Sequence, residues 1–264
     1  MYELQYSKPS SVNDAVAEIK KSSDAKFLAG GMTMIPTLKA RLSSADLLVD
    51  LKGANLSNIS VSSSEVVVGS MTRHCDVASS SDIKGSLPAL AKLAGGIGDH
   101  MVRSCGTIGG SLANNDPAAC YPSAVLALGA TVVTNERSIT ADDFFEGMFE
   151  TALNEDEIIT EIKFPIPEKA SYIKFPNPAS RYAMVGVFMV KKAEGISVAV
   201  TGAGENGVFR CNEIENVLNS NFALEALDNI QISHDNLTSD IHASAAYRAN
   251  LIKEMAKKAL QELI

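Results

Sequence analysis

The hydrophobic positions of the first fifty residues follow helical and strand-like spacings in turn. A helix is predicted to begin at Ser11, because a serine followed three residues later by an acidic residue is typical of a helix N-terminus. A second helix is predicted from Thr33, and the apolar stretches KFL and LLVDL predict strands. Apolar residues recur at helical spacing at Ala15, Val16 and Ile19, and again at Ile35, Leu38 and Leu42. Residues 1–51 are therefore expected to form a small βαβαβ-like unit.

The middle of the chain continues this mixture of strands and helices. The stretches EVVVGS, ATVVTN and DEIITEIKFPIP predict strands, and two prolines close the last of them. Helices are predicted for TRHCDVASS, for Leu87–Leu93 and for Ser123–Leu128, and Gly95 and Gly96 end the second of these. A domain boundary is therefore expected near residue 166.

The last third of the chain has a different pattern. SYIKF, YAMVGVFMVKK and GISVAVTGAG predict three strands. The sequence turns helical from Asn212 onward and ends in a long amphipathic helix near Ala243–Ile264. We expect a small α+β domain over residues 167–264, with a three-stranded sheet plus helices, and an α+β fold class for the whole chain.

Composition and charge argue against several classes of protein. Hydrophobic residues make up 46% of it, but the longest apolar runs fall short of the roughly 20 residues that a membrane helix needs, so no membrane span is predicted. The first residues show no secretory leader, which favours a cytoplasmic protein. The net charge of -8 argues against a nucleic-acid partner. The four cysteines and four histidines lack the spacing of a disulfide framework, a zinc site or an iron–sulfur cluster.

Two glycine pairs are the strongest candidates for a binding site. Gly30–Gly31 and Gly109–Gly110 each follow a strand or an extended segment and stand just before a predicted helix. Glycine lets consecutive amides point one way, and a helix N-terminus adds partial positive charge, so together the two pairs suit a diphosphate. Glycine pairs are also common in simple turns. A valine at either glycine of the second pair is expected to fill the path of the diphosphate with little loss of fold.

Other motifs compete with this interpretation. Gly202, Gly204 and Gly207 match the dinucleotide pattern G-x-G-x-x-G after a strand, but the residues that follow are extended, so a hairpin turn is favoured. No P-loop is present, and GGSLA departs from the nucleophile elbow at its last position. Asp116 stands before a proline, where it could cap a turn or contact a ligand.

Six stretches, in this order and spacing, resemble one family over essentially the whole chain: FLAGGMTMIPTLKARL, LLVDL, VVVGSMTRHCDVASS, MVRSCGTIGGSLANNDPAACYP, EIITEIKFP and AAYRANLIKEMAKKAL. The sequence is similar to the FAD-binding (medium) subunit of molybdenum hydroxylases. Its motifs lean toward the aerobic carbon monoxide dehydrogenase type, and the xanthine and nicotinate dehydrogenase flavin domains are relatives. The resemblance implies a two-subdomain FAD-binding fold of the vanillyl-alcohol oxidase (PCMH) type over residues 1–166, divided near residue 53.

The same resemblance implies a set of cofactor contacts. One side of the FAD diphosphate is expected to meet Ala29, Gly30, Gly31, Met32 and Thr33. The other side is expected to meet Thr107, Ile108, Gly109, Gly110 and Ser111. Further contacts are expected from Arg103, Asp116, Ile159 near the adenine end, Lys174, and Tyr182 near the isoalloxazine ring. Cys120 stands where relatives often carry an aspartate that binds the ribose hydroxyls, so weaker FAD affinity is expected.

The family also implies a role and partners. We expect noncovalent FAD that receives electrons from two [2Fe-2S] clusters in a small partner subunit, with molybdopterin in a large partner subunit, in a dimer of heterotrimers. A quinone, NAD or oxygen would then be reduced. A xanthine-, nicotinate- or aldehyde-type dehydrogenase, a stand-alone FAD oxidase and a flavin-free assembly module are the alternatives. The last is suggested by Cys120 and by Met32 and Ser111, where relatives commonly carry histidine and asparagine.

Overall fold

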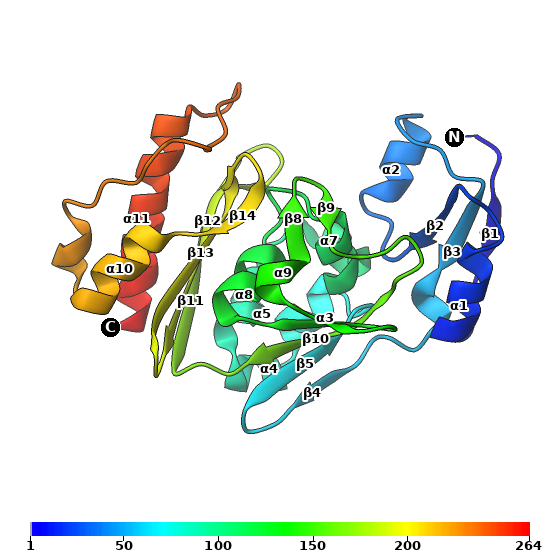
Figure 1. Cartoon of the computed structure of the whole chain (residues 1–264), viewed down its shortest axis with the longest axis horizontal. Coiled ribbons are helices and arrows are strands. Elements are labelled where there is room, and N and C mark those ends of the chain that lie inside the picture. The colour runs from blue at the N-terminus through cyan, green and yellow to red at the C-terminus, as the bar shows by residue number, and fades with distance from the viewer. Residues whose placement is uncertain (1) are drawn as a thin grey trace.

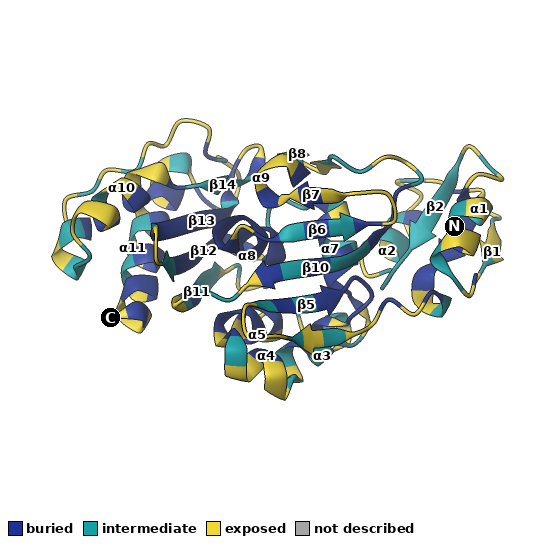
Figure 2. Ribbon diagram, turned by 60° about the horizontal axis from the view of Figure 1, so that its bottom comes forward, coloured by how far each residue is buried: buried dark blue, intermediate teal, exposed yellow. Residues whose placement is uncertain are grey.

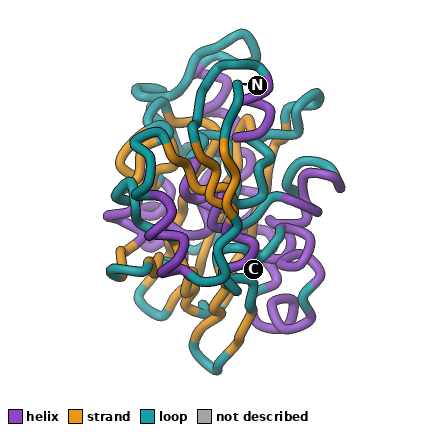
Figure 3. The backbone as a smooth tube through the Cα atoms, turned by 90° about the vertical axis from the view of Figure 1, so that its right-hand side faces the viewer, coloured by secondary structure: helices purple, strands orange, loops and turns teal. Residues whose placement is uncertain are grey.

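The computed structural model describes residues 2–264 and arranges them as three consecutive units along the long axis of the molecule (Figure 1). The first unit is a parallel sheet with strand order β1-β3-β2. Figure 3 views the molecule from this end and shows strands running through the centre with helices on either side. The elements of this unit are β1 (Gln5–Ser7), α1 (Val12–Ile19), β2 (Ala25–Leu28), α2 (Met34–Lys39), β3 (Leu47–Asp50) and the 3-10 turn η1 (Leu51–Gly53).

Helix α2 is shorter than the sequence pattern predicts. It begins at Met34 and ends at Lys39, and Leu42 lies beyond it with 80% of its surface exposed. Arg41 adopts a left-handed backbone, and the amides of Arg41 and Leu42 donate to the carbonyls of Leu38 and Thr37. This is a Schellman C-terminus, which ends the helix before Leu42 can join its apolar face. The prediction of one helix with Ile35, Leu38 and Leu42 at helical spacing was therefore wrong for Leu42.

The second unit is a five-stranded antiparallel sheet with strand order β4-β5-β10-β6-β7. Its core is the largest in the described part of the chain and includes Val66, Leu90, Ile162 and Phe164. The strands are β4 (Ile59–Val61), β5 (Glu65–Gly69), β6 (Thr131–Thr134), β7 (Ser138–Thr140) and β10 (Ile159–Pro165), with the hairpin β8 (Phe145–Gly147) and β9 (Glu150–Thr151). The helices are α3 (His74–Ser79), α4 (Ser81–Ser86), α5 (Pro88–Gly95), α6 (His100–Cys105), α7 (Ile108–Asn114), α8 (Tyr121–Leu128) and α9 (Ala141–Phe144).

The third unit is an antiparallel sheet with strand order β11-β12-β13-β14. It contains the three predicted strands and a fourth, short strand that follows the G-x-G-x-x-G stretch. Gly204 pairs with Gly207 across this turn, so the predicted hairpin is confirmed. The elements are β11 (Lys169–Pro176), β12 (Ala183–Lys192), β13 (Gly195–Gly204), β14 (Gly207–Arg210), α10 (Asn212–Ser220), the 3-10 turn η2 (Leu224–Leu227) and α11 (Ala245–Leu263).

Helix α8 joins the second and third units. All of its residues are buried, as expected of a helix that is apolar on every side. One face of the third sheet packs against it through Phe188 and Val190, and the other face packs on α10 and α11 through Val187 and Met189. Figure 2 shows the resulting burial along β12 and β13. Within residues 2–264, no helix is long and apolar enough to span a membrane.

Candidate functional site

A cavity of about 430 Å³ lies where the three units meet. Its walls come from the β2–α2 turn, the ends of β5 and β10, the segment 106–120 and the end of β11 with the loop that follows it. Most of the residues predicted to contact a cofactor line it: Ala29, Gly30, Gly31, Met32, Thr33, Thr107, Gly109, Gly110, Ser111, Asp116, Cys120, Ile159, Lys174 and Tyr182. The topology therefore brings together segments that lie far apart in the sequence.

Two of the predicted residues do not reach the cavity wall. The Arg103 guanidinium donates to the carbonyls of Ile97 and Gly98, at 3.0 and 3.1 Å, and so fixes the loop between α5 and α6. Ile108 is fully buried in the core of the second unit. Both residues support the wall, and neither lines the cavity in this structure.

The first glycine pair forms a turn with free backbone donors. Gly31 has a φ of +71°, and none of the amides of residues 30–33 donates to an acceptor among the described residues. A run of unbonded amides at a cavity is a typical anion site. Gly30 is required for a different reason, because a Cβ there would lie 2.3 Å from the Cys105 carbonyl oxygen and 2.7 Å from the Gly106 Cα. The two glycine-rich segments thus touch through backbone.

The second glycine pair lies inside the first turn of α7, and so it does not precede the helix as predicted. A Cβ on Gly109 would lie 2.5 Å from the Ser70 Cβ and 2.8 Å from the Ser70 oxygen, so this glycine lets α7 pack against the end of β5. On Gly110 a Cβ would meet the Thr107 hydroxyl at 2.9 Å and the Ala29 Cβ at 3.1 Å. The expectation that valine at Gly109 leaves the fold intact was wrong, because the side chain would collide with backbone.

Two basic residues, Lys174 and Arg181, also line the cavity. The Lys174 ammonium on β11 donates to the Gly96 and Arg181 carbonyls and lies 3.7 Å from the Cys120 sulfur. Arg181 has a left-handed backbone with a φ of +64°, and it lines the cavity beside Tyr182, which keeps 47% of its surface exposed. Two basic residues are therefore among those that line the cavity.

Asp116 caps a turn, which is one of the two roles predicted for it. Its Oδ1 accepts a hydrogen bond of 2.8 Å from the Ala118 amide, so the aspartate caps the turn before α8. Asp116 also lines the cavity, so ligand contact stays a prediction.

The structure adds polar residues that sequence reasoning missed. Ser70 and His74 line the cavity, and both are buried. Ser70 Oγ and His74 Nδ1 have no partner among the described residues. Burial, together with the charge of Arg103, lowers the pKa of His74 to about 4, so its imidazole is neutral at pH 7. No local motif marks either residue, because each reaches the cavity only through the pairing of distant segments.

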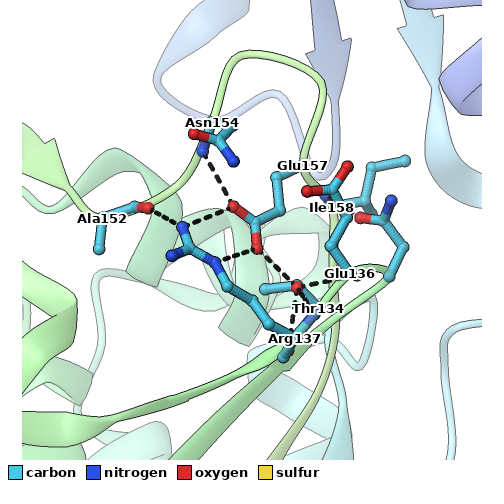
Figure 4. A network of polar contacts seen from close by, with 8 residues as sticks. Thr134, Glu136, Arg137, Ala152, Asn154, Glu157 and Ile158 are labelled. Atoms are coloured by element: carbon cyan, nitrogen blue, oxygen red, sulfur yellow. Dashed lines mark hydrogen bonds and ion pairs between the residues drawn. The ribbon is translucent and has the colours of Figure 1, made fainter.

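Glu157 is the third polar residue that the sequence did not reveal (Figure 4). Its side chain is fully buried, and its carboxylate accepts hydrogen bonds from the Thr134 hydroxyl (2.7 Å), from Arg137 (3.0 Å to each oxygen) and from the Asn154 amide (3.0 Å). Burial alone would raise the pKa of this group, but these bonds outweigh it and lower the pKa to about 2. The network fixes the loop that carries Leu153 and Ile158 along the cavity.

These features fit a flavin nucleotide. Unbonded amides and two cations suit a diphosphate, and the apolar walls suit flat aromatic rings. Among residues 2–264, no group of histidine, cysteine or acidic side chains is arranged to hold a metal ion.

Comparison with known families decides the assignment. Residues 2–167 match the model of the FAD binding domain in molybdopterin dehydrogenase. This chain belongs to that family. The predicted family resemblance is thereby confirmed, as are the mixed fold and the place of the chain among dehydrogenase subunits with FAD as their cofactor.

Relatives of this flavin-binding family match along almost the whole chain. The glyceraldehyde dehydrogenase medium chain of Sulfolobus acidocaldarius is 32% identical, covering 99% of this chain and 98% of its own. The carbon monoxide dehydrogenase medium chain of Hydrogenophaga pseudoflava is also 32% identical, covering 97% and 96%. The reconstituted CO dehydrogenase from Oligotropha carboxidovorans superposes with a TM-score of 0.90 at 29% identity, covering 99% and 97%. Such relatives are medium chains of multisubunit dehydrogenases.

Proposed function

We propose that this chain is the electron-transfer subunit of a molybdenum-containing dehydrogenase and holds FAD noncovalently in the cavity between its three units. The observation that carries the proposal is the run of unbonded amides at residues 30–33, which closes one side of the cavity. Bound FAD would supply the redox chemistry, accepting electrons and passing them to an external acceptor.

The residues of this chain bind and orient the cofactor. The amides of residues 30–33 would hold the diphosphate, and Lys174 would add a cation at the same cavity. Ser111, at the start of α7, and Ile159, on β10, extend the wall along the cofactor. Tyr182 is half exposed at the cavity, where it would offer an aromatic surface to the isoalloxazine ring.

The partners follow from the medium-chain character of the relatives. We infer a large subunit with molybdopterin, a small subunit with two [2Fe-2S] clusters and a dimer of such heterotrimers. The glyceraldehyde and carbon monoxide enzymes are equally similar to this chain, so the carbon monoxide type stays a prediction. The substrate pocket would lie in the large subunit.

An absorption spectrum tests the proposal. The purified chain, mixed with excess FAD and passed through gel filtration, is expected to elute with flavin bands at close to one FAD per chain. The same measurement on the co-expressed complex is the control for a cavity that forms fully only on assembly. A folded chain that retains no flavin in either form would overturn the proposal and favour the flavin-free assembly module.

Replacing Cys120 with aspartate is expected to tighten FAD binding. Cys120 lines the cavity and its sulfur lies 3.7 Å from the Lys174 ammonium, so a carboxylate there would have a positive neighbour and could accept from ribose hydroxyls. A charged hydrogen bond of this kind corresponds to an increase in affinity of about tenfold. Fluorescence titration of C120D and of C120S, which matches the size of cysteine without the charge, measures it. An affinity equal to that of the wild type would place residue 120 away from the ribose.

A further inference from the structure

Arg248 is a buried arginine far from the cavity in sequence. It lies in the first turn of α11 with 4% of its surface exposed. Its Nη1 donates to the carbonyls of Met184 (2.7 Å) and Gly202 (2.8 Å), and its Nη2 donates to the Asp240 carboxylate (2.7 Å). One guanidinium therefore ties the start of β12 to the end of β13.

The end of β13 in turn holds one wall of the cavity. The Gly202 amide donates to the Pro117 carbonyl at 2.8 Å. The Thr201 hydroxyl lies 3.0 Å from the same oxygen and 2.6 Å from the Ala119 oxygen. Asp116, Ala118, Ala119 and Cys120 of this turn all line the cavity. The bonded path thus runs from Arg248 through Gly202 and Thr201 to the cavity wall.

The start of β12 leads to the cavity by a second route. Tyr182 lines the cavity and directly precedes this strand, so the carbonyl that Arg248 binds at Met184 lies two residues beyond the tyrosine. Gly202 has a φ of +82°, and a Cβ there would lie 2.3 Å from the Ala183 oxygen. The two strand ends are therefore in close backbone contact at the point where Arg248 joins them.

We propose that Arg248 is a positioning residue for the cofactor site, which fixes the turn 116–120 on one side and Tyr182 on the other. The C-terminal helix is then part of the machinery that binds FAD, although none of its residues lines the cavity. The inference rests on the proposed function. The ion pair of Arg248 with the partly exposed Asp240 is a weak source of net stability, so a role in holding one geometry accounts for the buried arginine better than stability does.

Arg248→Met is the test variant. It removes the bonds to both carbonyls but keeps an apolar stem of similar length, and Asp240 is exposed enough to be hydrated once its partner is lost. FAD affinity is expected to fall by about tenfold, because the turn and the tyrosine must be ordered on binding. The FAD affinity of Arg248→Lys is expected to lie between those of the wild type and Arg248→Met, since one ammonium cannot reproduce the fork of a guanidinium.

Arg210→Met is the matched control. Arg210 forms a comparable pair with Glu215, at 2.6 Å, in the same C-terminal unit, and neither residue lines the cavity. FAD affinity by fluorescence titration and the melting temperature of the FAD-free chain are measured for all variants. We expect Arg248→Met and Arg210→Met to lower the melting temperature equally, and only the Arg248 variants to lose FAD affinity. Millimolar guanidinium chloride is expected to restore part of the FAD affinity of Arg248→Met.

Two outcomes would overturn the inference. If Arg248→Met binds FAD as tightly as the wild type, the guanidinium does not position the site. If both arginine variants lose affinity in proportion to their melting temperatures, Arg248 serves stability alone. The wild-type titration separates these outcomes from a failure of the proposed function, in which the unmodified chain and its complex would bind no FAD.

Discussion

Replacing Gly30 with alanine is expected to abolish FAD binding. The new Cβ would lie 2.3 Å from the Cys105 oxygen and 2.7 Å from the Gly106 Cα, both of which are backbone atoms and cannot rotate away. The turn with the unbonded amides would have to move off the segment before α7, which would open the cavity along its whole diphosphate wall. Forcing a methyl group into such a contact costs about 1–3 kcal/mol of folding stability.

The measurement is a flavin titration of Gly30→Ala together with a thermal melt of the FAD-free chain. Gly85→Ala is the matched control, because a Cβ at Gly85 in α4 would have no atom within 4 Å. That control is expected to bind FAD as the wild type does. Full flavin occupancy in Gly30→Ala would show that FAD binding does not depend on the close contact of the two glycine segments, and it would contradict the assignment of this turn to the FAD site.

The N-terminal glycine turn was predictable from the sequence because its signal is local. Gly30 and Gly31 stand between a strand and a helix, and the structure places them at the cavity with their amides free. The hairpin at Gly204 and Gly207 was predictable for the same reason, since the residues after it look extended and not helical. Local patterns determine turns, and turns make up much of this site.

The second glycine pair shows the limit of that reasoning. A glycine before or within a helix can serve ligand approach or close packing, and sequence alone does not separate the two. Gly109 serves packing, because Ser70, the residue after β5, lies against it. Arg103 and Ile108 lie beside the motif in sequence but support the wall from behind. Which residue faces the cavity depends on tertiary contacts between segments that lie far apart in the chain.

The same limit explains the residues that were missed. His74 and Glu157 come from different parts of the second unit, and each lines the cavity only because the fold pairs its segment with distant ones. The extent of α2 was missed for a local reason. Arg41 takes the left-handed position after the helix that glycine usually fills, so no glycine in the sequence marks the end of α2.

Replacing Glu157 with glutamine is expected to cost about 3 kcal/mol of folding stability at neutral pH. The pKa of this carboxyl falls from 4.5 to about 2 on folding, and the corresponding energy of about 3 kcal/mol is lost with the charge. The Arg137 guanidinium and the Asn154 amide would also lose the carboxylate that accepts their hydrogen bonds. Chemical denaturation of the wild type and of Glu157→Gln at pH 7 measures the difference. Glu161→Gln is the control, because Glu161 forms a partly exposed pair with Lys163 and surface pairs contribute about 0–1 kcal/mol.

The dependence on pH separates the charge of Glu157 from its shape. A group whose pKa is lowered on folding stabilises the protein above its unfolded pKa, and this contribution disappears as the pH falls through its folded pKa. The stability difference between the wild type and Glu157→Gln is therefore expected to be constant above about pH 5 and to shrink between about pH 4.5 and pH 2. A difference that stays constant down to pH 2 would mean that the carboxylate is not held ionised by Arg137. The loop with Leu153 and Ile158 would then owe its place at the cavity to packing alone.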